Sequence, residues 1–251
     1  WSSDVCSSDL SGSREDYYIG NVFSLQWDLN AIALSRFMEI NPVGRKIFLR
    51  YEYESSRFNP TDTVSKTGNL VHVYNNPSFH RLEMKWKEYT QLPGWKHTLS
   101  LSLRGGTILG KQQDDFFDFY LGGLIGMKGY PYYAVGGNQI ASLNASYRFP
   151  IKENIDVRIA PLYFDKLYGS FYYDVGDAWT GGGLKNRKYI RDVGTELRLD
   201  AFSWYAFPTR IFFNASYGLD KFTRFTRNDK LVTYGHEWRF YFGVLFGFDF
   251  D

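Results

Sequence analysis

Histidines and carboxylates are the side chains with which this chain could perform acid–base or metal chemistry. Only four histidines occur: His72, His80, His97 and His236. A nucleophilic hydrolase would need one of them beside a serine and a carboxylate at a common rim, and no spacing specifies such a cluster. Asp114 and Asp115 are adjacent and would point oppositely on an extended backbone, which favours solvated loop charges over a metal or acid/base site. We therefore expect no catalysis, no cofactor and no metal.

Lys128 lies in a segment whose composition predicts a packed loop. Six glycines between residues 122 and 137 permit tight turns and close approach to a wall. Aromatic side chains too apolar to stay in water accompany them: Phe116, Phe117, Phe119, Tyr130, Tyr132 and Tyr133. We therefore expect residues 107–137 to fold inward onto neighbouring strands. The alternative is that Lys128 is an ordinary exposed loop lysine.

The elements that would position this loop are strands, and the last one is the clearest. From residue 235 to 250, apolar side chains occupy every second position on one side: Trp238, Phe240, Phe242, Val244, Phe246, Phe248 and Phe250. In water such a face needs a covering layer. In a transmembrane β-barrel, lipid covers this outer face, while water and polar side chains fill the lumen.

Nine segments alternate apolar and polar residues at the period of a β-strand. They are 20–31, 45–56, 80–90, 96–106, 138–149, 167–179, 189–201, 208–219 and 235–250. Charged residues on their polar faces are expected to form a network on the lumen wall: Arg104, Arg148, Glu196, Arg198, Glu237 and Arg239. The predicted fold is all-β, an antiparallel transmembrane β-barrel with a long inward-folding loop.

The connections between these segments alternate in length. One set is mostly short and contains Pro42, Pro93, Pro150 and Pro208. The other set is usually longer and more polar, near 57–79, 107–137, 180–188 and 220–234. Outer-membrane barrels have short periplasmic turns, which predicts a periplasmic C-terminus. We place 150–166 on the short-turn side, because another strand there would reverse every later side assignment. Nine is an odd number of strands, so the barrel is expected to be incomplete.

Composition excludes other classes of protein. Residues 1–10, WSSDVCSSDL, read back into a common sequencing-adapter DNA sequence, so we treat them as an artefact. The only cysteine, Cys6, goes with them. Residues 11–251 are then expected to be the C-terminal part of an outer-membrane β-barrel domain. The formal net charge of the whole chain is +2, which gives no case for nucleic acid. Aromatics make up 20%, yet mean hydropathy is −0.37 and no apolar run approaches the roughly 20 residues of a spanning helix.

Three motifs carry a family resemblance. Residues 119–151 contain Leu-Gly-Gly, then Met-Lys-Gly-Tyr, then Gly-Gly-Asn and a strand ending Tyr-Arg-Phe-Pro. With FYYDVGDAW at 171–179 and VGTELR at 193–198, this order resembles the bacterial surface-antigen barrel of the barrel-assembly superfamily (BamA/TamA-type insertases). The resemblance covers about residues 20–251. It implies a sixteen-strand barrel of which these are the last nine, with seven strands missing upstream.

The resemblance also implies a loop site. In that family an Arg-Gly-aromatic tip enters the lumen and binds acidic residues of the wall, and here Lys128, Gly129 and Tyr130 stand in its place. By strand parity Asp174 and Glu196 face the lumen, and either is expected to pair with Lys128. Lysine departs from the family pattern, because an ammonium is a point charge without the fork of a guanidinium.

The last strand resembles the C-terminal recognition signal of outer-membrane proteins. Its residues are Tyr241, Gly243, Phe246, Phe248 and Phe250. The implied function is polypeptide insertion or translocation at the outer membrane of a Gram-negative bacterium. The expected partners are membrane lipid, unfolded outer-membrane proteins and periplasmic accessory proteins. The alternatives are a passive channel, a membrane anchor for a missing N-terminal periplasmic domain, and a soluble all-β binding domain.

Overall fold

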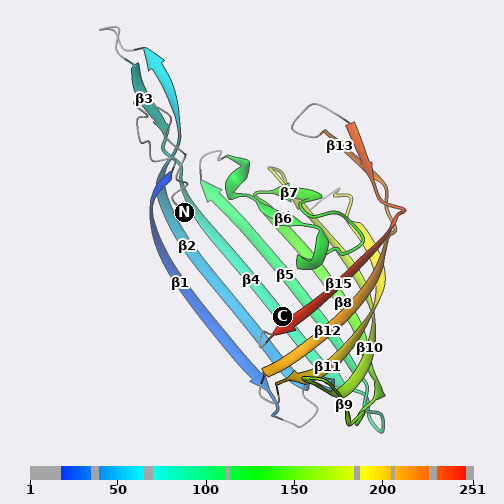
Figure 1. The fold of residues 1–251 in the computed structure, drawn as a ribbon. Helices are drawn as coiled ribbons and strands as arrows, with labels where there is room; N and C mark the ends of the chain where they lie inside the picture. The colour runs from blue at the N-terminus through cyan, green and yellow to red at the C-terminus, as the bar shows by residue number, and fades with distance from the viewer. Residues whose placement is uncertain are drawn as a thin grey trace, which may run out of the picture.

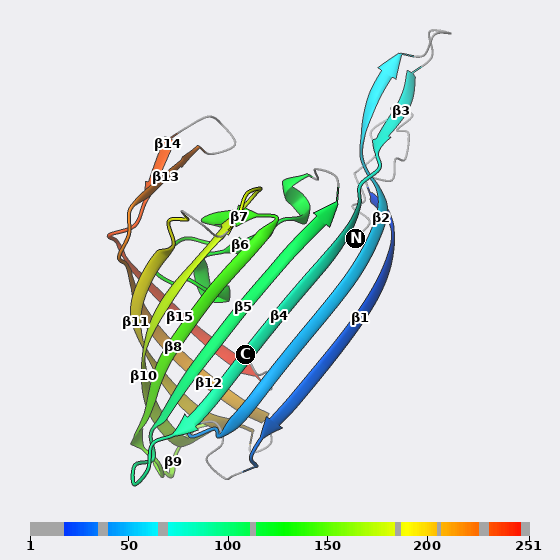
Figure 2. The same ribbon diagram turned by 180° about the vertical axis from the view of Figure 1, so that it is seen from behind.

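The structure is a computed structural model that describes residues 18–34, 40–64, 70–110, 114–183, 187–204, 207–225 and 231–246. Within these ranges, nine long strands form one antiparallel sheet in the order β1–β2–β4–β5–β8–β10–β11–β12–β15. Their bounds are β1 Tyr18–Ile32, β2 Gly44–Val64, β4 Ser78–Gln91, β5 Thr98–Gly110, β8 Gln139–Lys152, β10 Leu162–Trp179, β11 Ile190–Ser203, β12 Phe207–Gly218 and β15 Trp238–Phe246. The sheet curls into an open, half-barrel shape with β1 and β15 at its free edges (Figures 1 and 2).

Each of the nine predicted segments corresponds to one of these strands, so the all-β, antiparallel prediction is confirmed. The strand predicted at 167–179 begins earlier, at Leu162. The one predicted at 235–250 begins later, at Trp238, because Gly235 and His236 have φ of 102° and 58° and make a turn. The described part of the sheet does not close, since β15 pairs with β12 and β1 pairs with β2.

The two faces of the sheet differ as the alternation predicts. On the outer, convex face, Phe242 is 71% exposed and Leu25 is 64% exposed. On the inner, concave face lie buried polar side chains such as Asp174, Glu196 and Asn214. An outer surface of bare aromatic and aliphatic side chains is what lipid can cover, and a polar inner face is what water can fill.

The connections alternate between the two ends of the sheet, also as predicted. Residues 153–161 contain only the short β9 (Val157–Ile159), which pairs with the start of β10, while β8 and β10 pair directly. The segment therefore belongs to the short-turn end. At the other end, the connection near 57–79 is long, as predicted, and part of it is a hairpin. β2 continues to Val64, beyond the predicted end at residue 56, and pairs with β3 (Leu70–Asn75).

A second hairpin stands at the same end as the β2–β3 hairpin. It consists of β13 (Phe222–Phe225) and β14 (Leu231–Tyr234), and it connects β12 with β15. Figure 1 shows both hairpins rising above the rim of the sheet. The β13–β14 hairpin agrees with the prediction that 220–234 is one of the longer connections.

The long segment between β5 and β8 lies on the concave face. Its described part contains two 3-10 helices, η1 (Asp115–Phe117) and η2 (Gly123–Ile125), and a small ladder of β6 (Phe119–Leu121) with β7 (Val135–Gly137). No helix of the described residues is long and apolar enough to cross a membrane.

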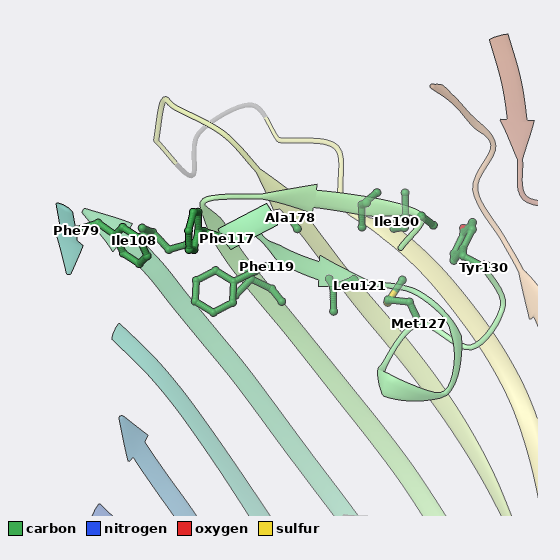
Figure 3. Packing of buried hydrophobic residues seen from close by; sticks show 12 residues of the cluster. Phe79, Ile108, Phe117, Phe119, Leu121, Met127, Tyr130, Ala178 and Ile190 are labelled. Carbon is green, nitrogen blue, oxygen red and sulfur yellow. The ribbon is translucent and has the colours of Figure 1, made fainter. Parts of the chain in front are cut away.

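A hydrophobic cluster joins this segment to the inner wall (Figure 3). Its buried members are Phe79, Ile108, Phe117, Phe119, Leu121, Met127, Tyr130, Ala134, Val135, Ile140, Ala178 and Ile190. Three of the four ring-bearing members, Phe117, Phe119 and Tyr130, come from the segment. The wall contributes residues of β4, β5, β8, β10 and β11. The segment therefore folds inward, because burial on the wall removes its apolar side chains from water.

Candidate functional site: the loop tip on the inner wall

The ammonium group of Lys128 binds a carboxylate of the wall. Lys128 Nζ lies 3.2 Å from Glu196 Oε2 and 4.4 Å from the centroid of the Tyr172 ring. Glu196 also accepts hydrogen bonds from Asn214 Nδ2, at 3.1 Å, and from Arg198 Nε. The Glu196 side chain is 6% exposed and that of Lys128 21%. The pair is therefore largely desolvated, where an ion pair is screened less than at a surface.

Asp174, the other predicted partner, lies in the same buried region but is bound differently. Its Oδ1 accepts a hydrogen bond from Asn144 Nδ2, whereas the salt bridge of Lys128 goes to Glu196. Asp174 is directly opposite Asp192 in the register of β10 and β11. The tip therefore meets three buried carboxyl groups rather than the expected two.

The backbone of Gly129 lies in close contact with the wall. Its N–H donates to Asp192 Oδ2 at 2.9 Å. A Cβ at this position would lie 2.6 Å from Asp192 Cβ and 2.7 Å from the backbone nitrogen of Gly218. Only glycine fits this approach without a shift of the backbone, which is the physical reason for its place in the tip.

The Tyr130 side chain links the tip to the rim. Its hydroxyl is 2.9 Å from the carbonyl oxygens of both Arg191 and Asp220 and can donate its one proton to either. It also accepts from the N–H of Asp220 at 3.0 Å. The ring packs 5.5 Å from that of Phe222 in the rim hairpin. Burial raises the pKa of the Tyr130 hydroxyl to about 12, so it stays protonated and able to donate.

The carbonyl oxygen of Lys128 is held by two strands at once. Ser216 Oγ of β12 donates to it at 2.8 Å, and the Tyr241 hydroxyl of β15 donates to it at 3.0 Å. The Tyr241 ring also meets the Tyr132 ring edge-on, at 6.4 Å and 88°. The tip therefore contacts β10, β11, β12 and β15.

Strand register explains how these groups meet. Even-numbered residues of β10, β11 and β12 face inward, so Asp174, Asp192, Glu196, Asn214 and Ser216 share one face. In β15 the inward set is odd-numbered, because Asn214 is paired with Tyr241. Sequence reasoning missed the contributions of Asp192 and Ser216. The parity that selected Glu196 also selects Asp192, and this signal was available.

Three acidic residues, Asp114, Asp115 and Asp118, lie in and around η1, at the start of the described loop. Asp114 caps η1 through a hydrogen bond from Phe116 N to its Oδ1 at 3.0 Å, and both Asp114 and Asp115 are exposed. Burial, reinforced by the charge of Asp115, raises the pKa of Asp118 to about 6. Arg81 stacks over the Phe119 ring at 4.3 Å. Asp114 thus caps η1, which lies beside the partly buried carboxyl group of Asp118.

The histidines lie at separate places. His80 Nδ1 is 2.8 Å from the Tyr51 hydroxyl near one end of β4, whereas His97 contacts the Tyr147 hydroxyl near the short-turn end. His236 Nε2 is 2.8 Å from the carbonyl oxygen of Leu219. The side chain of His72 lies outside the described part of the structure.

The wall charges predicted to form a network pair locally. Arg104 Nε is 3.1 Å from Glu83 Oε1, and Arg239 is 3.2 Å from Glu237. Arg198 pairs with Glu196 and so joins the Lys128 site.

The predicted recognition strand is described in part. Tyr241, Gly243 and Phe246 lie in β15, whereas Phe248 and Phe250 are outside the described residues. A Cβ on Gly243 would lie 2.5 Å from the Phe212 ring, so this glycine makes room for an aromatic side chain of β12. Phe246 is exposed on the outer face.

The arrangement holds the loop tip on the wall by charge, hydrogen bonds and packing. A comparison with protein families matches residues 48–243 to the Omp85 superfamily domain. A search of curated proteins found no match. The match covers most of the strands and the whole loop tip, and the chain therefore belongs to the Omp85 superfamily.

Proposed function

We propose that this protein inserts or translocates polypeptides at the bacterial outer membrane, with the loop tip as a lock on the wall of the barrel. Membership of the Omp85 superfamily supports the membrane and this general class of activity. The bare apolar outer face supports lipid contact rather than a soluble all-β binding domain. The docking of Lys128, Gly129 and Tyr130 on four strands is the observation that carries the proposal.

The described strands would be the last nine of a closed barrel of sixteen. β1 offers fifteen residues whose second edge pairs with nothing in the described sheet, so an upstream strand could continue the ladder there. The end of β15 lies at the short-turn end, because Phe246 pairs with Thr209 near the start of β12. In an outer-membrane barrel that end faces the periplasm, which would place the C-terminus there.

The working element would be the seam at β15. A free strand edge presents N–H and C=O groups that can template an incoming strand, so an unfolded outer-membrane protein could pair with it. The nine described residues of β15 pair with β12 on one side only. The docked loop braces this last pairing from the inside while the seam is closed.

Lysine in the tip makes this lock simpler than one built on arginine. A single ammonium-to-carboxylate contact at 3.2 Å replaces the two parallel bonds that a guanidinium can make. Arg198 occupies the other carboxylate oxygen of Glu196, so the wall itself supplies a guanidinium. The tip is then held by Lys128 and released without breaking the wall pair.

The test is reconstitution of the native protein in lipid vesicles, followed by addition of an unfolded outer-membrane protein. Insertion activity would raise the yield of folded, protease-resistant client over vesicles alone. Lys128→Ala should reduce that gain, whereas Lys221→Ala, which removes an exposed lysine outside the tip, should not. Ion conductance without client folding would favour the passive channel. If the protein shows neither client folding nor ion conductance, the result would favour a membrane anchor.

A further inference from the structure

The final strand, β15, has one neighbour in the described sheet. Its backbone pairs with β12 from Trp238 to Phe246, and no other described strand pairs with it. Within the described residues, the ladder with β12 is therefore the one backbone pairing that holds β15. A side chain that ties β15 to a third element would change how easily this ladder opens.

Tyr241 is such a side chain. Its hydroxyl donates to the carbonyl oxygen of Lys128 at 3.0 Å, and the two residues are 113 positions apart in the chain. Ser216 of β12 donates to the same oxygen at 2.8 Å. One carbonyl group of the loop tip therefore bridges β12 and β15 from the inside.

The position of the Tyr241 ring supports the bridge. Tyr241 is partly buried on the inner face, and its ring meets Tyr132 of the loop edge-on. Its opposite partner, Asn214, is fully buried and donates to Glu196, the carboxylate that holds Lys128. Asn214, which binds the carboxylate of the ion pair, is thus directly paired with Tyr241, which forms the bridge.

We propose that Tyr241 is a positioning residue that couples docking of the loop tip to the pairing of β15 with β12. While the tip is docked, its carbonyl group holds both strands, and β15 stays paired with β12. When the tip leaves the wall, β15 loses its third attachment and separates from β12 more readily. The consequence for client insertion rests on the proposed function, whereas the coupling itself is a property of the folded chain.

The test measures hydrogen exchange of β15 backbone amides in the native protein folded into lipid bilayers. Tyr241→Phe keeps the ring and removes only the hydroxyl. Loss of one hydrogen bond should accelerate exchange in β15 about fivefold. Amides in the β5–β8 ladder should be unaffected. The matched control is Tyr217→Phe, the same change on the outer face of the same β12–β15 ladder, where the ring contacts Trp238.

Gly129→Ala separates coupling from a local structural role. The added Cβ would collide with Asp192 and Gly218, so this variant undocks the tip. Exchange of β15 should then accelerate on its own, and adding Tyr241→Phe should produce no further change. Such non-additivity is the mark of two residues acting through one interaction.

Equal, additive effects of the two substitutions would overturn the coupling, as would unchanged exchange in Tyr241→Phe. The same variants should be assayed for client folding. Coupled exchange with no insertion activity in the parent protein would refute the proposed function while leaving the coupling intact. Insertion activity with uncoupled exchange would refute the coupling alone.

Discussion

Replacing Lys128 with alanine should loosen the docked loop by about 2 kcal/mol. The substitution removes a hydrogen bond to a charged group, which typically contributes about 1.5–3 kcal/mol, and a cation–π contact with Tyr172. Stranding a buried charge costs about 3–5 kcal/mol. The full penalty is not expected here, because Glu196 keeps its bonds from Arg198 and Asn214.

The amide of Gly129 reports this change directly. It donates to Asp192 Oδ2 only when the tip is docked, so its hydrogen exchange measures the opening of the loop. A change of about 2 kcal/mol corresponds to roughly 30-fold faster exchange, since about 1.4 kcal/mol is a factor of ten. The measurement should be made in lipid bilayers at constant salt.

Two further variants control the interpretation of the Lys128 substitution. Lys128→Arg should preserve docking, because guanidinium can donate to the same carboxylate. Lys221→Ala, on an exposed lysine outside the tip, should leave Gly129 exchange unchanged. An effect of Lys128→Ala below about twofold would mean that the pair behaves like an exposed surface salt bridge, and the argument for a lock would fail.

Three other predictions concern lipid contact, the rim and pH. Near the membrane midplane, Phe242→Arg should destabilise the barrel by about 2–4 kcal/mol in a bilayer folding assay. Leu245→Arg, on the inner face of the same strand, should cost less. Equal costs of the two substitutions would contradict the assignment of faces. Tyr130→Phe should cost about 1–3 kcal/mol, because the N–H of Asp220 loses its acceptor, and unchanged exchange of that amide would argue against it. Burial raises the pKa of Asp118 to about 6, above the roughly 3.9 of an unfolded chain. Because the folded loop favours the protonated carboxyl group, the loop should be most stable below about pH 4 and should lose stability as the pH rises through about 6. Asp118→Asn should abolish this trend in proteolysis of the loop at graded pH, and a loop that instead becomes more resistant as pH rises would refute it.

The period of the side chains was enough to predict the sheet. Alternation such as Phe23, Leu25 and Trp27 has only one structural meaning at period two, because successive side chains of a strand point to opposite faces. The same alternation placed Glu196 and Asp174 on the inner face and Phe242 on the outer one. The glycines and aromatics of the loop likewise predicted inward packing, since neither the ring of Phe119 nor that of Tyr130 could be left in water.

The contacts of the loop tip required the tertiary structure. Parity says which face a carboxylate is on, but not its height along the barrel relative to a loop that joins other strands. The register of β10 with β11 brings Asp192 opposite Asp174, and the path of the loop brings Lys128 to Glu196, 68 positions away. Tyr241 was expected only as part of a terminal signal, and its bond to the Lys128 carbonyl is visible only after folding. The alternation of residues determines which way a side chain points, because it reflects local backbone geometry. The partner of that side chain depends on strand register and on the path of the loop, and the packing of the whole sheet decides both.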